Sequence, residues 1–187
     1  MLRPVRKLTL HDYDEVLELY ARGYAQDEYY KRVFKTDDCY QAIKDNFGLD
    51  VQHALLFGYA YGYFSRDKKL VGFILACNFN DWRNNHVDAY NHLFAFVCKE
   101  TLDWIESVHK SLRDLGTNAC YIFALTVKAG YDVDIVAYAL VNQLVNKYGK
   151  SMCIFSDLST TAMTKACSRC GFVKLTAEGG YGFVVKH

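Results

Sequence analysis

Two neighbouring carboxylates lie among aromatic residues near the start of the chain. The segment Tyr24-Ala-Gln-Asp-Glu-Tyr-Tyr places Asp27 and Glu28 between tyrosines, and Phe34 follows shortly after. A carboxylate can accept a proton from a reacting group, and aromatic neighbours that exclude water raise its pKa towards the range of an effective base. The alternative interpretation is a solvated acidic pair that opens a helix, because exposed carboxylates are common.

A potential anion site follows the most apolar segment of the sequence. Residues 119–127 form a nearly unbroken apolar run, rich in β-branched and aromatic residues, which predicts a strand buried on both faces. Apolar residues then recur at helical spacing from Val133, and Gly149 stands where a C-terminal cap is expected. The first N–H groups of such a helix have no partner within it and lie at the positive end of its dipole. We therefore expect the turn at 128–132 and the helix start to offer an anion site.

Cysteine and histidine residues give weaker signals. Cys167 and Cys170 form a Cys-x-x-Cys pair, but the sequence has no second pair, and this one follows a predicted helix instead of preceding it. His86 and His92 flank a polar loop without the spacing of metal ligands. We expect packing positions for the cysteines and no bound metal.

Hydroxyl residues follow the short strand that we predict at 152–155. Ser156, Ser159 and Thr160 would lie at the carboxyl end of this strand, where open α/β sheets bind ligands. The simpler interpretation is that Ser159 or Thr160 is the N-cap of the next helix.

Composition limits the classes of protein to consider. The chain has 187 residues, of which 51% are hydrophobic, so we expect a single domain over 1–187 with a sizeable core. A net charge of +1 with dispersed basic residues makes nucleic acid an unlikely partner. No apolar stretch reaches the ~20 residues of a membrane span, and no targeting segment is visible, so we expect a cytoplasmic protein without a membrane partner. Seven cysteines, several in apolar runs, favour free buried thiols over disulfides.

The order of predicted elements defines an α/β fold. A short strand is followed by helices, a β-hairpin, a long amphipathic helix, the apolar strand, and alternating helices and strands. This order predicts a mixed sheet flanked by helices on both faces, because the hairpin excludes a purely wound parallel sheet. The strands are expected at 4–10, 59–65, 70–77, 119–127, 152–155, 171–175 and 181–185, and the long helix at 90–115.

The strand, tight turn and helix start resemble the site at which the GNAT superfamily of acyl-CoA-dependent N-acetyltransferases holds the cofactor diphosphate. That family reads Val, two or three residues, Tyr, then Arg/Gln-x-x-Gly-x-Gly/Ala and a helical Leu. Here Val127, Tyr131, Ala137 and Leu140 occupy matching positions. The family's closing pattern, Asn-x-x-Ala-x-x-x-Tyr-x-x-x-Gly-Phe, ends here in Gly171-Phe172.

Other positions match the family in spacing and differ in residue type. Thr160, Met163 and Cys167 stand at the Asn, Ala and Tyr positions of the closing pattern. Asp132 replaces the Arg/Gln of the diphosphate motif, and Ile135 replaces its first glycine. A carboxylate thus lies where a diphosphate docks in the family.

Within the superfamily, the chain resembles the arylalkylamine-type acetyltransferases of animals. The inserted helix at 90–115 and the segment around Asp27 and Glu28 carry this resemblance, with Tyr29 in place of a proline. In that group an aromatic-x-x-Asp-Glu-Pro segment supplies a catalytic glutamate, so the resemblance implies that Glu28 is the base.

The resemblance implies an acetyl-CoA-dependent N-acetyltransferase that acts on a small primary amine, with aromatic amines among the candidates, as a monomer or homodimer. Backbone groups of Leu125, Thr126 and Val127 would contact the pantetheine arm and the acyl carbonyl. The remaining cofactor-binding positions that it implies are Asp132, Val133, Asp134, Ile135, Val136, Ala137, Thr160 and Cys167.

Two alternatives remain open from the sequence. In the first, the fold is retained but the cofactor site has decayed, which leaves a binding or regulatory protein. In the second, the acceptor is a protein lysine or an N-terminal amine. The segment Asp132-Val-Asp-Ile-Val-Ala divides the first alternative from the enzyme, because bulky side chains replace the glycines that allow close approach of a diphosphate.

Overall fold

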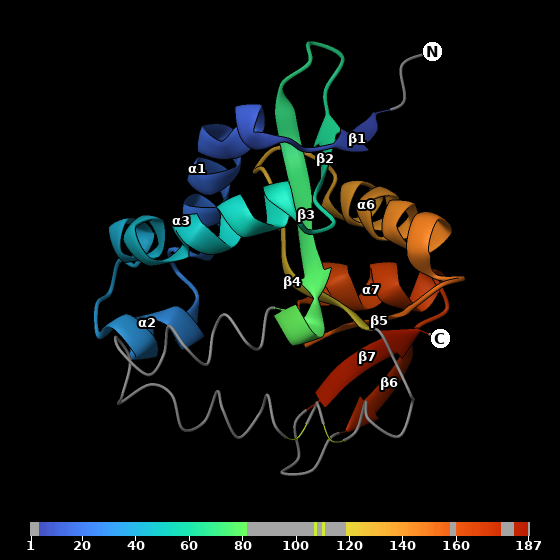
Figure 1. The fold of residues 1–187 in the computed structure, drawn as a ribbon. Helices are drawn as coiled ribbons and strands as arrows, with labels where there is room; N and C mark the ends of the chain where they lie inside the picture. Colours follow the sequence, from blue (N-terminus) through green and yellow to red (C-terminus); the bar gives the residue numbers. More distant parts are fainter. Residues whose placement is uncertain are drawn as a thin grey trace.

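The fold is built on one mixed sheet of seven strands in the order β1-β2-β3-β4-β5-β7-β6 (Figure 1). The computed structural model describes residues 4–81, 107, 110, 119–157, 160–176 and 182–186, without the side chains of 29, 32, 33, 182 and 183. Strands β4 and β5 are parallel, and the other neighbouring pairs are antiparallel. The strands are β1 (Val5–Lys7), β2 (Tyr61–Phe64), β3 (Leu70–Asn78), β4 (Ala119–Val127), β5 (Cys153–Ser156), β6 (Val173–Thr176) and β7 (Gly182–Lys186).

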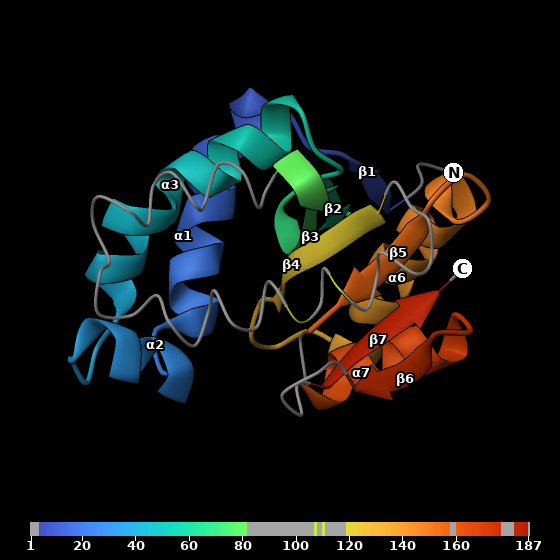
Figure 2. The ribbon, with the colours of Figure 1, turned by 60° about the horizontal axis from the view of Figure 1, so that its bottom comes forward.

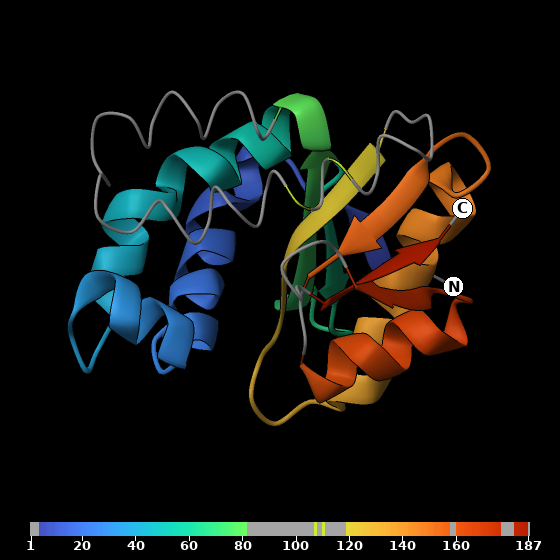
Figure 3. The same ribbon diagram turned by 90° about the horizontal axis from the view of Figure 1, so that it is seen from below.

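Helices cover both faces of this sheet. Seen from below, α1, α2 and α3 lie on one side, and α6 and α7 lie on the other (Figure 3). The view in Figure 2 shows β4 and β5 passing between these two groups. The helices are α1 (Tyr13–Tyr24), α2 (Glu28–Phe34), α3 (Tyr40–Leu56), α6 (Val133–Tyr148) and α7 (Thr161–Arg169), and a 3-10 turn, Leu10–Asp12, precedes α1.

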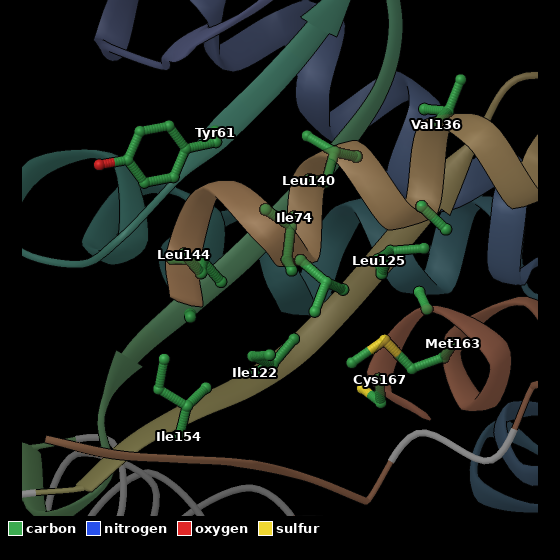
Figure 4. Close-up of a cluster of buried hydrophobic side chains, with 14 of the residues drawn as sticks. Tyr61, Ile74, Ile122, Leu125, Val136, Leu140, Leu144, Ile154, Met163 and Cys167 are labelled. Carbon is green, nitrogen blue, oxygen red and sulfur yellow. The ribbon is translucent and has the colours of Figure 1, made fainter. Parts of the chain in front are cut away.

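The sheet separates two hydrophobic clusters because its central strands are buried on both faces. Successive residues of β3 alternate between them: Phe73 packs towards α1 and α3, whereas Ile74 packs towards α6 and α7. On the second side, Leu140 and Leu144 of α6 belong to the same hydrophobic cluster as Ile122 of β4 (Figure 4). A strand with no polar face is what the apolar run at 119–127 predicts.

Most predicted elements are confirmed within the described residues. The central strand has the predicted bounds, α6 starts at Val133, and the hairpin joins β2 to β3. The first strand is shorter than predicted, because Asp12 accepts a hydrogen bond from the Thr9 backbone N–H at 2.9 Å and turns the chain into a helix. His86, His92, Ser159 and, apart from residues 107 and 110, the predicted helix at 90–115 lie outside the described residues.

The cysteines within the described ranges are free thiols, as predicted. The same ranges contain no group of three or more His, Cys, Asp or Glu side chains suited to a metal ion. Among the helices described, none combines the length and the apolar character that crossing a membrane requires.

Truncation of Leu140 tests whether α6 is fixed by its packing on the sheet. Leu140 has no exposed surface, so Leu140→Ala should lower the free energy of unfolding by about 2–5 kcal/mol in urea titrations. Leu49 on α3 is 77% exposed, and Leu49→Ala should change that free energy by less than about 0.5 kcal/mol. Equal losses in the two variants would contradict this packing.

Candidate functional site where β4 and β5 separate

Strands β4 and β5 pair over only part of their length. Their parallel register runs from Ala119 opposite Cys153 to Ile122 opposite Ser156. The Ser156 hydroxyl donates to the Ile122 carbonyl at 3.0 Å at the end of this register, while β4 continues along β3 to Val127. The last five residues of β4 therefore extend beyond the pairing with β5. This point is the carboxyl end of two parallel strands, where α/β proteins bind ligands.

Backbone groups of this part of β4 alternate between the two edges of the strand. Lys128 donates its N–H to the Val71 carbonyl of β3 at 2.7 Å. Because residues of an antiparallel pair alternate in the direction of their backbone groups, Leu125 and Val127 direct theirs away from β3. Two of the three residues predicted to contact pantetheine thus have their N–H and C=O groups at the edge that β5 leaves uncovered.

The Tyr24 hydroxyl occupies the backbone groups of Leu125. It donates to the Leu125 carbonyl at 3.1 Å and accepts from the Leu125 N–H at 3.2 Å. Loss of solvent raises the pKa of Tyr24 to about 12. This bridge satisfies both groups that an extended ligand would use, so a ligand pairing with Leu125 has to displace the phenol.

Helix α1 approaches β4 closely because Gly23 has no side chain. A Cβ at Gly23 would stand 2.5 Å from Thr126 Cγ2, which is too close for any other residue without a shift. Thr126 is buried, and its Oγ1 makes no hydrogen bond of normal geometry with another described residue. The Thr126 side chain nevertheless lies close enough to the Tyr24 hydroxyl to oppose the rise in the Tyr24 pKa. Thr126 therefore helps to seat α1 on the strand.

An aromatic cluster surrounds Tyr24 at the junction of α1, α2 and α3. Ring centroids lie 5.0 Å apart for Tyr20 and Tyr24 and 5.7 Å apart for Tyr24 and Tyr30. Phe34 and Phe47 extend the cluster through contacts with the Tyr30 ring. These ring contacts connect the start of α2 to Tyr24, which hydrogen-bonds to the exposed edge of β4.

Asp157 lies at this candidate site, and the sequence analysis did not single it out. It directly follows β5, and its Oδ1 accepts a hydrogen bond from the Tyr121 hydroxyl at 2.9 Å. Burial raises the pKa of Asp157 to about 6, and the hydrogen bond from Tyr121 opposes this rise. The charges of Asp157 and Asp27 add to the effect of burial in raising the Tyr24 pKa, so both carboxylates act on the same region. A carboxylate immediately after a buried strand is the signal that could have identified Asp157.

Glu28 lies in the first turn of α2, as the alternative interpretation of the sequence predicts. Its side chain is 81% exposed, and its Oε1 lies 3.1 Å from Lys31 Nζ. The shielding of Glu28 by aromatic rings that the sequence suggested is therefore not seen in this structure.

The start of α6 is capped by its own chain. Asp132 is the N-cap, and its Oδ1 accepts from the Ile135 N–H at 3.0 Å. Val133 and Ile135 are 41% and 55% exposed, whereas Val136 and Ala137 are buried against the sheet. Of the predicted cofactor positions 132–137, the first four line the outer end of the helix, and the last two belong to the core.

A lysine that the sequence analysis did not single out lies beside this helix start. Lys165 Nζ of α7 is 2.9 Å from Asp134 Oδ2, and both side chains are about half exposed. The pair brings a positive charge to the first turn of α6 and offsets one of its two carboxylates.

The two predicted positions on α7 have structural roles here. Thr160 is the N-cap of α7, and its Oγ1 accepts from the Met163 N–H at 3.3 Å. Cys167 has no exposed surface, and burial raises the pKa of its thiol to about 12. The thiol lies beside Met163 in the hydrophobic cluster on this side of the sheet (Figure 4).

Comparison with solved structures identifies the fold as that of GNAT N-acetyltransferases. The chain matches a polyamine N-acetyltransferase of Drosophila melanogaster, which forms N-acetylagmatine, with 12% identity, 98% coverage of both chains and a TM-score of 0.73. A mosquito arylalkylamine N-acetyltransferase, like 5b, matches with 14% identity, coverage of 97% and 96%, and a TM-score of 0.71. The PaiA N-acetyltransferase of Thermoplasma acidophilum, in complex with coenzyme A, matches with 13% identity, coverage of 100% and 99%, and a TM-score of 0.57.

The sequence itself matches no protein-family model and no curated protein. The likeness therefore lies in the arrangement of strands and helices, and it confirms the predicted fold.

Removal of one hydroxyl tests the bridge between α1 and β4. Tyr24→Phe should lower the free energy of unfolding by about 1–3 kcal/mol, because the Leu125 N–H and C=O lose their partner in a buried place. Urea unfolding followed by circular dichroism measures this change. Tyr131 is 42% exposed, so the matched variant Tyr131→Phe should have little effect. A Tyr24→Phe protein as stable as the wild type would show that the bridge does not hold the strand edge.

Proposed function

We propose that the protein is an acetyl-CoA-dependent N-acetyltransferase that acts on a small primary amine. The observation that carries the proposal is the uncovered edge of β4, which leads directly into the N-terminus of α6 in a chain with the GNAT fold. The three structural relatives named above are N-acetyltransferases by name, which supports the same reaction class.

The strand edge and the helix start fit the two parts of the cosubstrate. An extended pantetheine arm can pair with the backbone of Leu125 and Val127 once the Tyr24 phenol moves. A diphosphate can bind the first N–H groups of α6 at the positive end of the helix dipole. Lys165 would add a cation there if it exchanged its carboxylate partner for a phosphate. When bound, acetyl-CoA supplies an activated acetyl thioester.

The protein must also handle the proton of the amine. An amine attacks only in its neutral form, so a carboxylate near the strand edge has to take a proton from the ammonium group. We keep Glu28 as the proposed base, acting directly or through water, because catalytic hydrogen bonds often form only in the substrate complex. Backbone N–H groups of β4 are the proposed donors to the acyl oxygen.

A second candidate function has specific support. The Asp132 carboxylate accepts a hydrogen bond from the Ile135 N–H, and the Tyr24 hydroxyl bonds to the N–H and C=O of Leu125. The chain itself therefore satisfies some of the backbone groups that the diphosphate and the pantetheine arm would use. A GNAT-fold protein in which these contacts are permanent would be a binding or regulatory protein without transferase activity. Titration with acetyl-CoA separates the two functions, because only the enzyme gains stability from millimolar ligand.

Removal of the Asp132 charge tests the proposed diphosphate site. Asparagine caps a helix about as well as aspartate, so Asp132→Asn should keep α6 intact. Loss of a negative charge beside the diphosphate is worth on the order of 1 kcal/mol, so coenzyme A should bind about fivefold more tightly in calorimetry. The control is Asp45→Asn on α3, which packs on the opposite face of the sheet from α6. Equal affinities of Asp132→Asn and the wild type would place the diphosphate elsewhere.

Replacement of the proposed base tests the proton transfer. Glu28→Gln should reduce kcat at neutral pH by about 10²-fold with tyramine or agmatine as acceptor, while the affinity for coenzyme A stays the same. The measurement is the initial rate of acetylation from pH 6 to 9, with Asp45→Asn as control. An unchanged rate over this range would remove Glu28 from the mechanism.

A further inference from the structure

We propose that Asp157, oriented by Tyr121, binds the positively charged amino group of the acceptor. The inference rests on the proposed function and deepens it, because it assigns the cation-recognition group of the site. It requires that Asp157 lies next to the place of reaction, that its charge is not already neutralised, and that its surroundings suit an organic cation.

The position of Asp157 meets the first requirement. It leaves β5 directly after Ser156, the last residue paired with β4, so it stands at the separation of the two strands. Its charge contributes to the raised pKa of Tyr24, whose hydroxyl contacts the Leu125 backbone. The same phenol that marks the proposed acyl position is therefore within electrostatic reach of Asp157.

The charge of Asp157 is not balanced by a cation within the described part of the chain. Its hydrogen-bond donors there are neutral groups, namely the Tyr121 hydroxyl, which donates to Oδ1, and its own backbone N–H. Lys31, on neighbouring α2, pairs with Glu28. Asp27 adds a second negative charge to the region of Tyr24. An ammonium group would supply the missing positive charge and donate a charge-assisted hydrogen bond to the carboxylate.

Aromatic rings next to Asp157 favour an organic cation over a hydrated metal ion. The Tyr121 ring stacks on Phe155 with centroids 5.1 Å apart, and Phe79 packs edge-on against both at 5.8 Å and 4.9 Å. The three rings are almost completely buried, so they exclude water from the side of the carboxylate that they cover, where a hydrated metal ion would lose its solvent. A carboxylate at the border of such a cluster is suited to an aliphatic or aromatic amine.

The charge of Asp157 costs stability, which argues against a purely structural role. Burial raises its pKa from 3.8 to about 6, so the folded state favours the protonated form. The stability gained from protonation is present below the ordinary pKa and is lost as pH rises through about 6. At neutral pH an asparagine here should therefore be tolerated at least as well as the aspartate.

Calorimetry of amine binding to the full-length protein, without acetyl-CoA, tests the proposal. Tyramine and agmatine are the cationic probes, and tyrosol, in which a hydroxyl replaces the amino group of tyramine, is the neutral probe. Asp157→Asn should weaken tyramine and agmatine binding at least tenfold at pH 7.5 and leave tyrosol binding within twofold. The control Asp45→Asn should match the wild type with all three probes, and circular dichroism should show that both variants fold.

The pH dependence gives a second readout that a structural role would not produce. Wild-type affinity for tyramine should fall as pH decreases through about 6, and Asp157→Asn should lose this transition. In Tyr121→Phe the transition should move to higher pH, because the hydrogen bond that lowers the Asp157 pKa is lost. Within the described part of the chain, the other titratable groups facing this region are Tyr24, Tyr30, Asp27 and Cys77.

The outcomes separate this inference from the proposed function. Equal amine affinities in Asp157→Asn and the wild type, equal losses for tyramine and tyrosol, or no amine binding at millimolar concentration would each overturn the role of Asp157. Acetyl-CoA binding tests the proposed function in a separate titration, and its failure would leave the amine result interpretable. Normal acetyl-CoA binding together with unchanged amine affinity would reject the inference alone.

Discussion

The early end of the pairing between β4 and β5 is the constraint on which the proposed site depends. After Ile122 and Ser156 the two strands no longer share a register, although β4 continues in register with β3. A strand edge without its neighbour presents unpaired backbone groups, which are costly when buried and useful when a ligand pairs with them. Two residues of the chain itself, Ser156 and Tyr24, already hydrogen-bond to backbone groups of β4 at and beyond this point. The edge is therefore the proposed ligand surface, and side chains of the protein already bond to some of its backbone groups.

The electrostatics of the site are divided between its two ends. At the start of α6, Asp132 serves the helix as a cap and opposes a diphosphate, while Lys165 neutralises Asp134. At the end of β5, the Asp157 carboxylate has a neutral partner and lies among aromatic rings. The proposed cosubstrate is an anion that would bind near the start of α6, and the proposed acceptor is a cation that would bind near the end of β5. The negative groups suit the acceptor better than the cosubstrate.

The fold was predictable because the burial of strands and helices requires apolar residues in characteristic patterns along the sequence. The run at 119–127 has no polar face, and the following apolar residues repeat every three to four positions, so β4 and α6 follow from local pattern alone. The site was less predictable, because its contacts join distant segments. The Tyr24 and Leu125 partners are 101 residues apart, and Tyr121 and Asp157 are 36 apart. The family resemblance placed Cys167 and Thr160 at cofactor positions, whereas the structure shows the roles that the simpler interpretation of the sequence gave them, a buried thiol and the N-cap of α7.

Hydrogen–deuterium exchange with and without acetyl-CoA tests the central claim most directly, because the claim concerns particular backbone N–H groups. If the cosubstrate pairs with the uncovered edge of β4 and docks on α6, exchange should slow in the second half of β4 and in the first turn of α6, while α3 remains unchanged. Saturating ligand that leaves the exchange of both segments as it is in the free protein would contradict the account.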